Sequence, residues 1–229
     1  MLGTLVNVIA IIIGSLIGLV FKNNISEKYN ETIVHAIGLG VILIGLRGAF
    51  KCDNFILIII SLAIGTLAGE ICRLEYRLEK VGDWLEKKFS KENQDGFATG
   101  FVTTTLLYCV GAMAIIGSLE SGLTGNHATL FAKSTIDGIM AIIFSSTMGI
   151  GVLFSSISVF LYQGSITLAA VYIKPFLTPE VISQTSAVGG LLIVALGINM
   201  LRENKIKVGN MLPAVFIPLI YYAGKQIFV

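Results

Sequence analysis

Eight apolar runs, each long enough or nearly long enough to cross a bilayer as a helix, dominate this sequence of 229 residues. A spanning helix needs roughly 20 mostly apolar residues, and only short segments remain between the runs. The sequence therefore predicts an all-α, polytopic transmembrane bundle that forms a single transmembrane domain over residues 1–229. The runs cover residues 2–21, 33–50, 55–73, 98–119, 131–148, 150–173, 185–201 and 209–227.

The stretch 131–173 has two interpretations, because no charged loop divides it. Gly149 and Gly151 permit a tight turn around Ile150. With a turn there the chain has eight spans, and without one it has seven. We expect the turn.

Composition supports a membrane location and excludes several partners. Hydrophobic residues make up 55% of the chain, charged residues only 13%, and the mean hydropathy is +0.85, whereas soluble domains are about 45–50% apolar and about 25% charged. The lipid bilayer is therefore the main expected partner. A net charge of +2, scattered over loops, excludes a nucleic-acid partner. Cys52, Cys72 and Cys109 lack metal-ligand spacing, so we expect free thiols and no cofactor.

Basic residues orient the predicted spans. Lys and Arg concentrate in the loops that follow odd-numbered spans, and the positive-inside rule places such loops in the cytoplasm. The predicted cytoplasmic loops are 22–31, 74–97 and 202–208, so eight spans leave both termini outside. The segment 120–130 contains no Lys or Arg, and we expect an external turn there in preference to a re-entrant loop.

The longest polar segment, residues 74–97, has an apolar stripe with helical spacing. One interpretation is an amphipathic helix on the cytoplasmic membrane surface. The other is a solvated connector whose stripe packs on the bundle. The stripe consists of Leu74, Leu78, Val81, Leu85 and Phe89.

Small residues suggest close helix packing and an internal repeat. Gly14 with Gly18, and Gly65 with Gly69, have the spacing that lets helices associate, within the chain or between copies in a homo-oligomer.

Gly14-Ser15 recurs as Gly164-Ser165, each followed by a polar loop and a glycine-rich span. With the predicted topology these units run in opposite directions, as in the inverted repeats of transporters. The alternative is similarity by composition alone.

Asp137 is the strongest candidate for a functional residue. A charge at the centre of a span costs roughly 2.5–3.5 kcal/mol and usually has a role. Lys133 lies one turn earlier, where the two can pair on one helical face. Nearby hydroxyls and amides add the oxygen ligands that hard cations prefer, and the metal, if any, is left open. The predicted ion or substrate site contains Asp137, Lys133, Ser134, Ser155, Ser156 and Gln163.

A purely structural interpretation of this site also stands. The ion pair would then only hold the bundle together, and the hydroxyls would bond to carbonyls of their own helices. Signatures of hydrolases, metalloproteases, phosphate loops and dinucleotide sites are missing from the sequence. We therefore expect no enzymatic activity.

Four segments are distinctive enough to compare with known families: GTLVNVIAIIIGSLIGL (3–19), CVGAMAIIGSLESGLTGN (109–126), KSTIDGIMAIIFSSTMGIGVLFSSI (133–157) and YQGSITLAA (162–170). They resemble one bacterial membrane protein family, catalogued as domain of unknown function 554. The resemblance covers essentially the whole chain. It implies a multi-pass protein of a prokaryotic plasma membrane and carries no activity or functional residue with it.

Two functions from different classes follow from these observations. The first is a transporter or channel for a small ion or solute, with a polar site in the central spans around Asp137. The alternative is a non-transporting membrane scaffold or regulatory protein that acts through the 74–97 segment.

Overall fold

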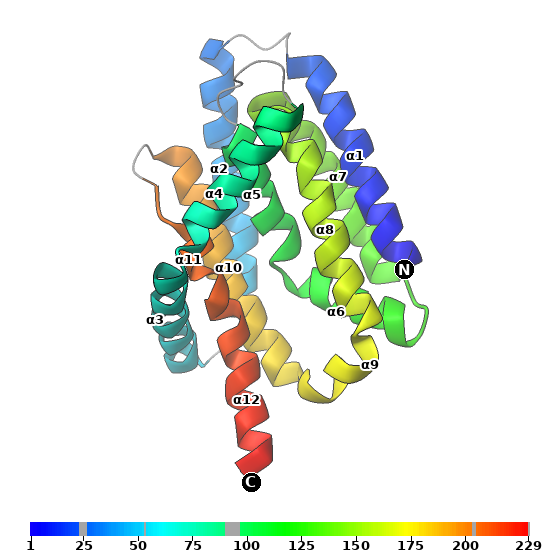
Figure 1. The fold of residues 1–229 in the computed structure, drawn as a ribbon, viewed down its shortest axis with the longest axis vertical. Coiled ribbons are helices and arrows are strands. Elements are labelled where there is room, and N and C mark those ends of the chain that lie inside the picture. Colours follow the sequence, from blue (N-terminus) through cyan, green and yellow to red (C-terminus); the bar gives the residue numbers. More distant parts are fainter. Residues whose placement is uncertain (23–26, 53, 90–96, 203–204, 229) are drawn as a thin grey trace. The chain divides into compact units, whose positions relative to one another are not determined.

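The computed structural model describes residues 1–22, 27–52, 54–89, 97–202 and 205–228. These residues form helices and no strands, which confirms the all-α prediction (Figure 1). The elements are α1 (Leu2–Lys22), α2 (Glu27–Ala49), α3 (Phe55–Cys72), α4 (Leu74–Phe89), α5 (Phe97–Cys109), α6 (Ala112–Leu123), α7 (Ala128–Met148), α8 (Gly151–Leu168), α9 (Ala170–Ile173), η1 (Lys174–Phe176), α10 (Pro179–Leu201), α11 (Val208–Met211), η2 (Leu212–Phe216) and α12 (Ile217–Phe228).

Six helices in the described part of the chain are long and apolar enough to cross a membrane: α1, α2, α3, α7, α8 and α10. A seventh crossing is available if α5 and α6 together make one span. These two helices bend by 58° at their break, as in a broken span or a re-entrant loop. The polytopic bundle is thus confirmed with six or seven candidate spans.

Two predicted runs differ from single continuous helices. The run 98–119 breaks between α5 and α6 at Val110 and Gly111, and glycine tolerates the backbone change. The run 209–227 is divided among α11, η2 and α12. Pro213 and Pro218 lie within it, and proline cannot donate the backbone hydrogen bond of a helix interior.

The connections on either side of α7 agree with the sequence. Gly149 has φ +82° and ends α7, and α8 begins at Gly151. This confirms the turn that divides 131–173. Within the segment 120–130, α6 ends at Leu123 and α7 starts at Ala128. The external turn, in preference to a re-entrant loop, stays a prediction.

The chain divides into two compact units. The first comprises Met1–Val34, Arg77–Cys109 and Met113–Val171, and the second comprises His35–Tyr76, Val110–Ala112 and Tyr172–Val229. The sequence gives no sign of this division, because hydropathy alone does not tell which spans contact one another.

In the first unit, α1 lies against α7 and α8 (Figure 1). A methyl group at Gly14 would overlap the carbonyl oxygen of Gly138, and one at Gly18 would overlap that of Ile142. Their small size therefore lets the α1 and α7 backbones touch, which confirms the predicted packing role of these glycines.

The second unit repeats this construction with other helices. Gly45 of α2 lies against the Gly190 carbonyl of α10, and Gly197 of α10 lies against the Gly38 carbonyl. Gly65 and Gly69 of α3 lie against the backbone of Ala214 and Asn210 in the same unit. The second predicted glycine pair thus also marks a close helix contact.

The outward faces are apolar and the inward faces are small or polar. On α1, Thr4, Asn7 and Ser15 are fully buried, whereas Ile13 is 52% exposed and Val20 is more exposed still. This is the reverse of a soluble helix, whose apolar stripe faces the core. Lipid is the solvent that matches such a surface.

Within α4 the apolar stripe is divided between two environments. Leu85 is buried in a cluster with Phe97, Phe101 and Phe154, whereas Val81 is exposed. The connector interpretation therefore holds at Leu85. The side chain of Phe89, and residues 23–26, 90–96 and 203–204 of the predicted cytoplasmic loops, lie outside the described residues.

Candidate functional site

A buried ion pair is the centre of the polar cluster in the first unit. The ammonium nitrogen of Lys133 donates to both carboxylate oxygens of Asp137, at 2.9 Å to Oδ1 and 2.7 Å to Oδ2. Lys133 is only 7% exposed and Asp137 only 4%. Both lie on α7 one turn apart, as their spacing predicts.

An amide from a neighbouring helix contacts this pair, and a second amide contacts the first. Asn7 of α1 donates from Nδ2 to Asp137 Oδ2 at 3.0 Å and to Gln163 Oε1 of α8 at 3.3 Å. Both amide side chains are fully buried. One asparagine thus connects the charged helix α7 with α8 and donates to the Asp137 carboxylate from outside α7.

Other polar side chains lie close to the ion pair. The Lys133 ammonium lies 6.0 Å from the ring centroid of Tyr108 on α5, at the outer limit of a cation–π contact. Thr4 and Thr167, one turn away from Asn7 and Gln163 on their helices, have hydroxyl oxygens 3.5 Å apart. Four helices of the first unit therefore contribute to the cluster: α1, α5, α7 and α8.

Three buried polar atoms in the cluster have no hydrogen-bond partner among the described residues: Asn7 Oδ1, Gln163 Nε2 and the Tyr108 hydroxyl. Exchanging the oxygen and nitrogen of Asn7 would not help, because its carbonyl would then face the Asp137 carboxylate. An unsatisfied buried polar group costs about 1–3 kcal/mol. These atoms are therefore available to a small polar guest.

The predicted site residues fall into two groups. Asp137, Lys133 and Gln163 come together through Asn7. Ser134, Ser155 and Ser156 are buried, but their hydroxyls donate to carbonyls of their own helices, those of Leu130, Val152 and Leu153, at 2.6, 2.7 and 2.7 Å. No hydrogen bond among the described residues joins them to Asp137, and their role as oxygen ligands stays a prediction.

The sequence marks Asn7 as a polar residue but does not show which residue it contacts. It interrupts an apolar run near the N-terminus, and this signal predicts a hydrogen bond between helices, which the structure confirms. Its partner, 130 positions away, cannot be deduced from local spacing. Tyr108 carries no comparable signal, because tyrosine is common in membrane helices.

The charges of the cluster balance one another. Among the described residues, no three His, Cys, Asp or Glu side chains gather closely enough to hold a metal ion. Asp137 is the one carboxylate in the cluster described above, and its charge is already balanced by Lys133. A multivalent cation would find too little negative charge here.

The fold and this cluster define the class of protein: a multi-pass α-helical membrane protein whose first unit holds a buried ion pair. The chain belongs to the family described as "Protein of unknown function (DUF554)", whose family model matches residues 2–223.

Two relatives match over nearly their full lengths. One is the "Uncharacterized membrane protein YdfK" of Bacillus subtilis (strain 168), 36% identical over 222 residues that cover 95% of this chain and 94% of the relative. The other is the "Uncharacterized protein YqgA" of Escherichia coli (strain K12), 30% identical over the same shares of both chains. No solved structure matches the chain.

Proposed function

We propose that this protein transports a small monovalent cation, and that Asp137 is the anionic ligand of the transported ion. The observation that carries this proposal is the Lys133–Asp137 pair, buried within helices whose outer surfaces are apolar. Charged residues at such depth are costly, and in membrane proteins they commonly mark ion pathways or proton relays.

Lys133 occupies the position that a cation would take. Its ammonium contacts both oxygens of Asp137, so an incoming cation has to displace it. The pair is neutral as a whole, and one added positive charge in a medium of low dielectric constant is strongly unfavourable. Loss of a proton from Lys133 removes this excess charge. We therefore propose that the cation exchanges for a proton at this site.

Two amide oxygens supply further ligands. Asn7 Oδ1 has no hydrogen-bond donor in the described part of the chain, and Gln163 Oε1 accepts from Asn7 Nδ2 at 3.3 Å. Together with an Asp137 oxygen they give the oxygen set that suits a hard cation. Ser155 and Ser156 lie about 10–12 Å along α8 from Gln163, at 1.5 Å per residue. Their spacing of seven and eight residues places them on its side of the helix, where their oxygens suit an access path.

Flux measured in liposomes of purified protein tests this proposal. Sodium or potassium gradients should drive proton movement, recorded by a pH-sensitive dye trapped inside the vesicles. Asp137→Asn should abolish the signal. Asp83→Asn, which changes an exposed aspartate on α4, is the matched control and should retain it. Equal proton movement in both variants would exclude Asp137 as the ligand.

The alternative function is a membrane scaffold that acts through α4. The exposed Val81 and Trp84 on this helix favour it. A scaffold predicts no flux for any cation or solute and the co-purification of another membrane protein. Flux that depends on Asp137 would rule out scaffolding as the sole function. We propose no enzymatic activity.

A further inference from the structure

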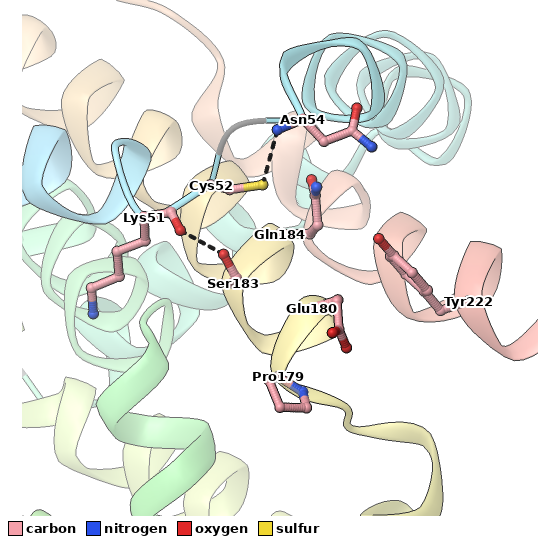
Figure 2. A pocket seen from close by; sticks show the side chains of 8 residues that line it. All are labelled: Lys51, Cys52, Asn54, Pro179, Glu180, Ser183, Gln184 and Tyr222. Atoms are coloured by element: carbon pink, nitrogen blue, oxygen red, sulfur yellow. Dashed lines mark hydrogen bonds between the residues drawn. The ribbon is translucent and has the colours of Figure 1, made fainter.

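A pocket of about 410 Å³ in the second unit has no feature that selects a guest (Figure 2). Gln184 Oε1 on its wall is buried and has no hydrogen-bond donor among the described residues. The Glu180 carboxylate is exposed, and in Figure 2 it points away from the Gln184 amide. A single buried oxygen of this kind can accept a hydrogen bond from water, so the pocket favours no class of ligand.

In the first unit, a second carboxylate is bonded to the residue one turn before Lys133. Thr129, in the first turn of α7, donates from its hydroxyl to Glu120 Oε2 of α6 at 2.6 Å. Thr129 precedes Lys133 by four residues, as Lys133 precedes Asp137, so the three lie along one face of α7. This face therefore carries, in order, the contact with Glu120, the ammonium and the Asp137 carboxylate.

Lys133 can approach Glu120 by a rotation of its own side chain. In the structure its ammonium contacts Asp137, toward the C-terminal end of α7. Side chains of a helix usually lean toward the N-terminus, which here is the direction of Thr129 and Glu120. Four residues of a helix rise about 6 Å, a distance that the flexible four-carbon stem of lysine spans. After such a rotation the ammonium lies within range of the Glu120 carboxylate.

Glu120 differs from Asp137 in its access to water. Asp137 is 4% exposed, whereas Glu120 is partly exposed, close to the turn between α6 and α7. A proton that leaves the buried Lys133 needs an acceptor on its way to water, and carboxylates serve as such relays in membrane transporters. Asp137 is not free for this task while it holds the incoming cation.

A purely structural role explains the bond between Glu120 and Thr129 but not the charge. A glutamine would accept from the Thr129 hydroxyl equally well, and it would avoid a charge among apolar helices. We propose that Glu120 takes up the proton that Lys133 loses when a cation binds Asp137, and passes it to water. This inference rests on the proposed exchange of a cation for a proton.

The transfer is balanced in charge and in atoms. An N–H bond of Lys133 breaks and an O–H bond forms on Glu120, so both side chains become neutral. The proton then leaves Glu120 for water, which restores the charge of the carboxylate. Thr129 holds that carboxylate in place through its hydroxyl and is a positioning residue.

Glu120→Gln tests the relay in liposomes of purified protein. The new amide oxygen still accepts from Thr129, but the side chain no longer takes up a proton. Proton movement driven by a sodium or potassium gradient should fall about tenfold or more, because a positioned proton acceptor typically contributes at least that factor. Glu120→Asp keeps a carboxyl group and should retain most of the signal. The matched control is His127→Gln, which changes the titratable side chain of the same turn. In the structure His127 Nδ1 lies 3.0 Å from Ser121 Oγ, and this variant should behave as the wild type does.

A second flux separates proton transfer from a structural effect. Exchange of labelled for unlabelled sodium, or of rubidium in place of potassium, needs cation binding but no net movement of protons. This exchange should stay near the wild-type rate in Glu120→Gln. An unchanged proton signal in this variant, loss of cation exchange along with the signal, or an equal loss in His127→Gln would overturn the relay. A wild-type protein in which cation gradients drive no proton movement would instead refute the exchange proposed at Asp137.

Discussion

At Asp137 a single carboxylate is held by donors from two helices. Lys133 contacts both of its oxygens, and Asn7 contacts one of them. In a dry interior each of these hydrogen bonds replaces hydration that the charge has lost. Removing one partner of a buried ion pair therefore costs about 3–5 kcal/mol, whereas removing both costs much less.

The first prediction uses this asymmetry. Asp137→Asn should strand the Lys133 ammonium and lower the free energy of unfolding by about 3–5 kcal/mol. Asp137→Asn combined with Lys133→Met removes both charges and should restore most of the stability. The double variant should still transport no cation, because the anionic ligand is gone. Thermal unfolding in detergent and flux in liposomes measure the two effects separately.

A purely structural ion pair gives another result. Full transport by a stable double variant would remove Asp137 from the ion site and leave only a packing role. A double variant as unstable as the single one would show that the contacts of Asn7 and Gln163 around the carboxylate contribute more stability than its pairing with Lys133.

The sequence identifies the charged residues of the cluster but does not show which polar residues contact them. Asp137 and Lys133 stand out because they are charges in an apolar run at helical spacing. Gln163 and the three serines carry the same weak polar signal, yet only Gln163 reaches the ion pair through Asn7. The serine hydroxyls donate to carbonyls of their own helices. Whether a polar side chain bonds within its helix or reaches the cluster depends on how the helix is rotated, and composition does not reveal this rotation.

At the scale of elements, the contact between α1 and α7 depends on the absence of side chains. Gly14→Ala would place a methyl group on the Gly138 carbonyl, and overpacking of this kind costs typically about 1–3 kcal/mol. We expect a lower midpoint of thermal unfolding in detergent. Because α1 also carries Asn7, flux should fall as well.

Gly40 of α2 is the matched control for this substitution. An added methyl group there meets nothing within 4 Å. Since alanine favours a helix over glycine by roughly 0.5–1 kcal/mol, Gly40→Ala should be neutral or slightly stabilising. Equal destabilisation at both positions would mean that the α1–α7 contact is looser than described.

On α4, the apolar stripe in the sequence combines residues with different roles. Leu85 packs on Phe97, Phe101 and Phe154, whereas Trp84 is 57% exposed with the Lys88 ammonium 4.9 Å from its ring centroid. An exposed aromatic ring beside a cation suits the interface between membrane and water. Helical periodicity reveals the stripe, but it does not separate the side that meets protein from the side that meets lipid.

Fluorescence of Trp84 tests its environment, because the chain contains no other tryptophan. We expect strong quenching by brominated lipids in reconstituted vesicles and weak quenching by acrylamide from the water phase. Preferential quenching by acrylamide would place this face of α4 in water and favour the solvated connector.

Sequence also predicts most spans, and its failures have local causes. Runs of apolar residues locate α1, α3, α7, α8 and α10 because the bilayer requires their length. The break between α5 and α6 leaves hydropathy almost unchanged, so a hydropathy pattern does not show it. In the 209–227 run, Pro213 and Pro218 do signal a break in the helix, but a count of apolar residues ignores it.

For the whole molecule, charge predicts orientation. Basic residues in 22–31, 74–97 and 202–208 predict that these loops face the cytoplasm, and we propose a location in the plasma membrane of a prokaryote. Reporter fusions after residues 90, 125 and 205 should report inside, outside and inside. An outside signal at residue 90 would reverse the orientation.

The two units bear on the predicted inverted repeat. Its paired segments are α1 with α8, and α2 with α10. The first pair lies in the first unit, and α10 and most of α2 lie in the second. Each unit thus contains one helix from each copy, the distribution expected if two repeats interleave. The repeat itself stays a prediction.

We infer that the ion pair also eases the insertion of α7 into the membrane. Its two charges lie on one helix, four residues apart, so α7 carries its own counter-charge when it leaves the ribosome. A lone aspartate would meet the insertion machinery with a penalty of roughly 2.5–3.5 kcal/mol. Pairing with Lys133 should lower this penalty, so α7 should insert at a smaller cost than it would with Asp137 alone.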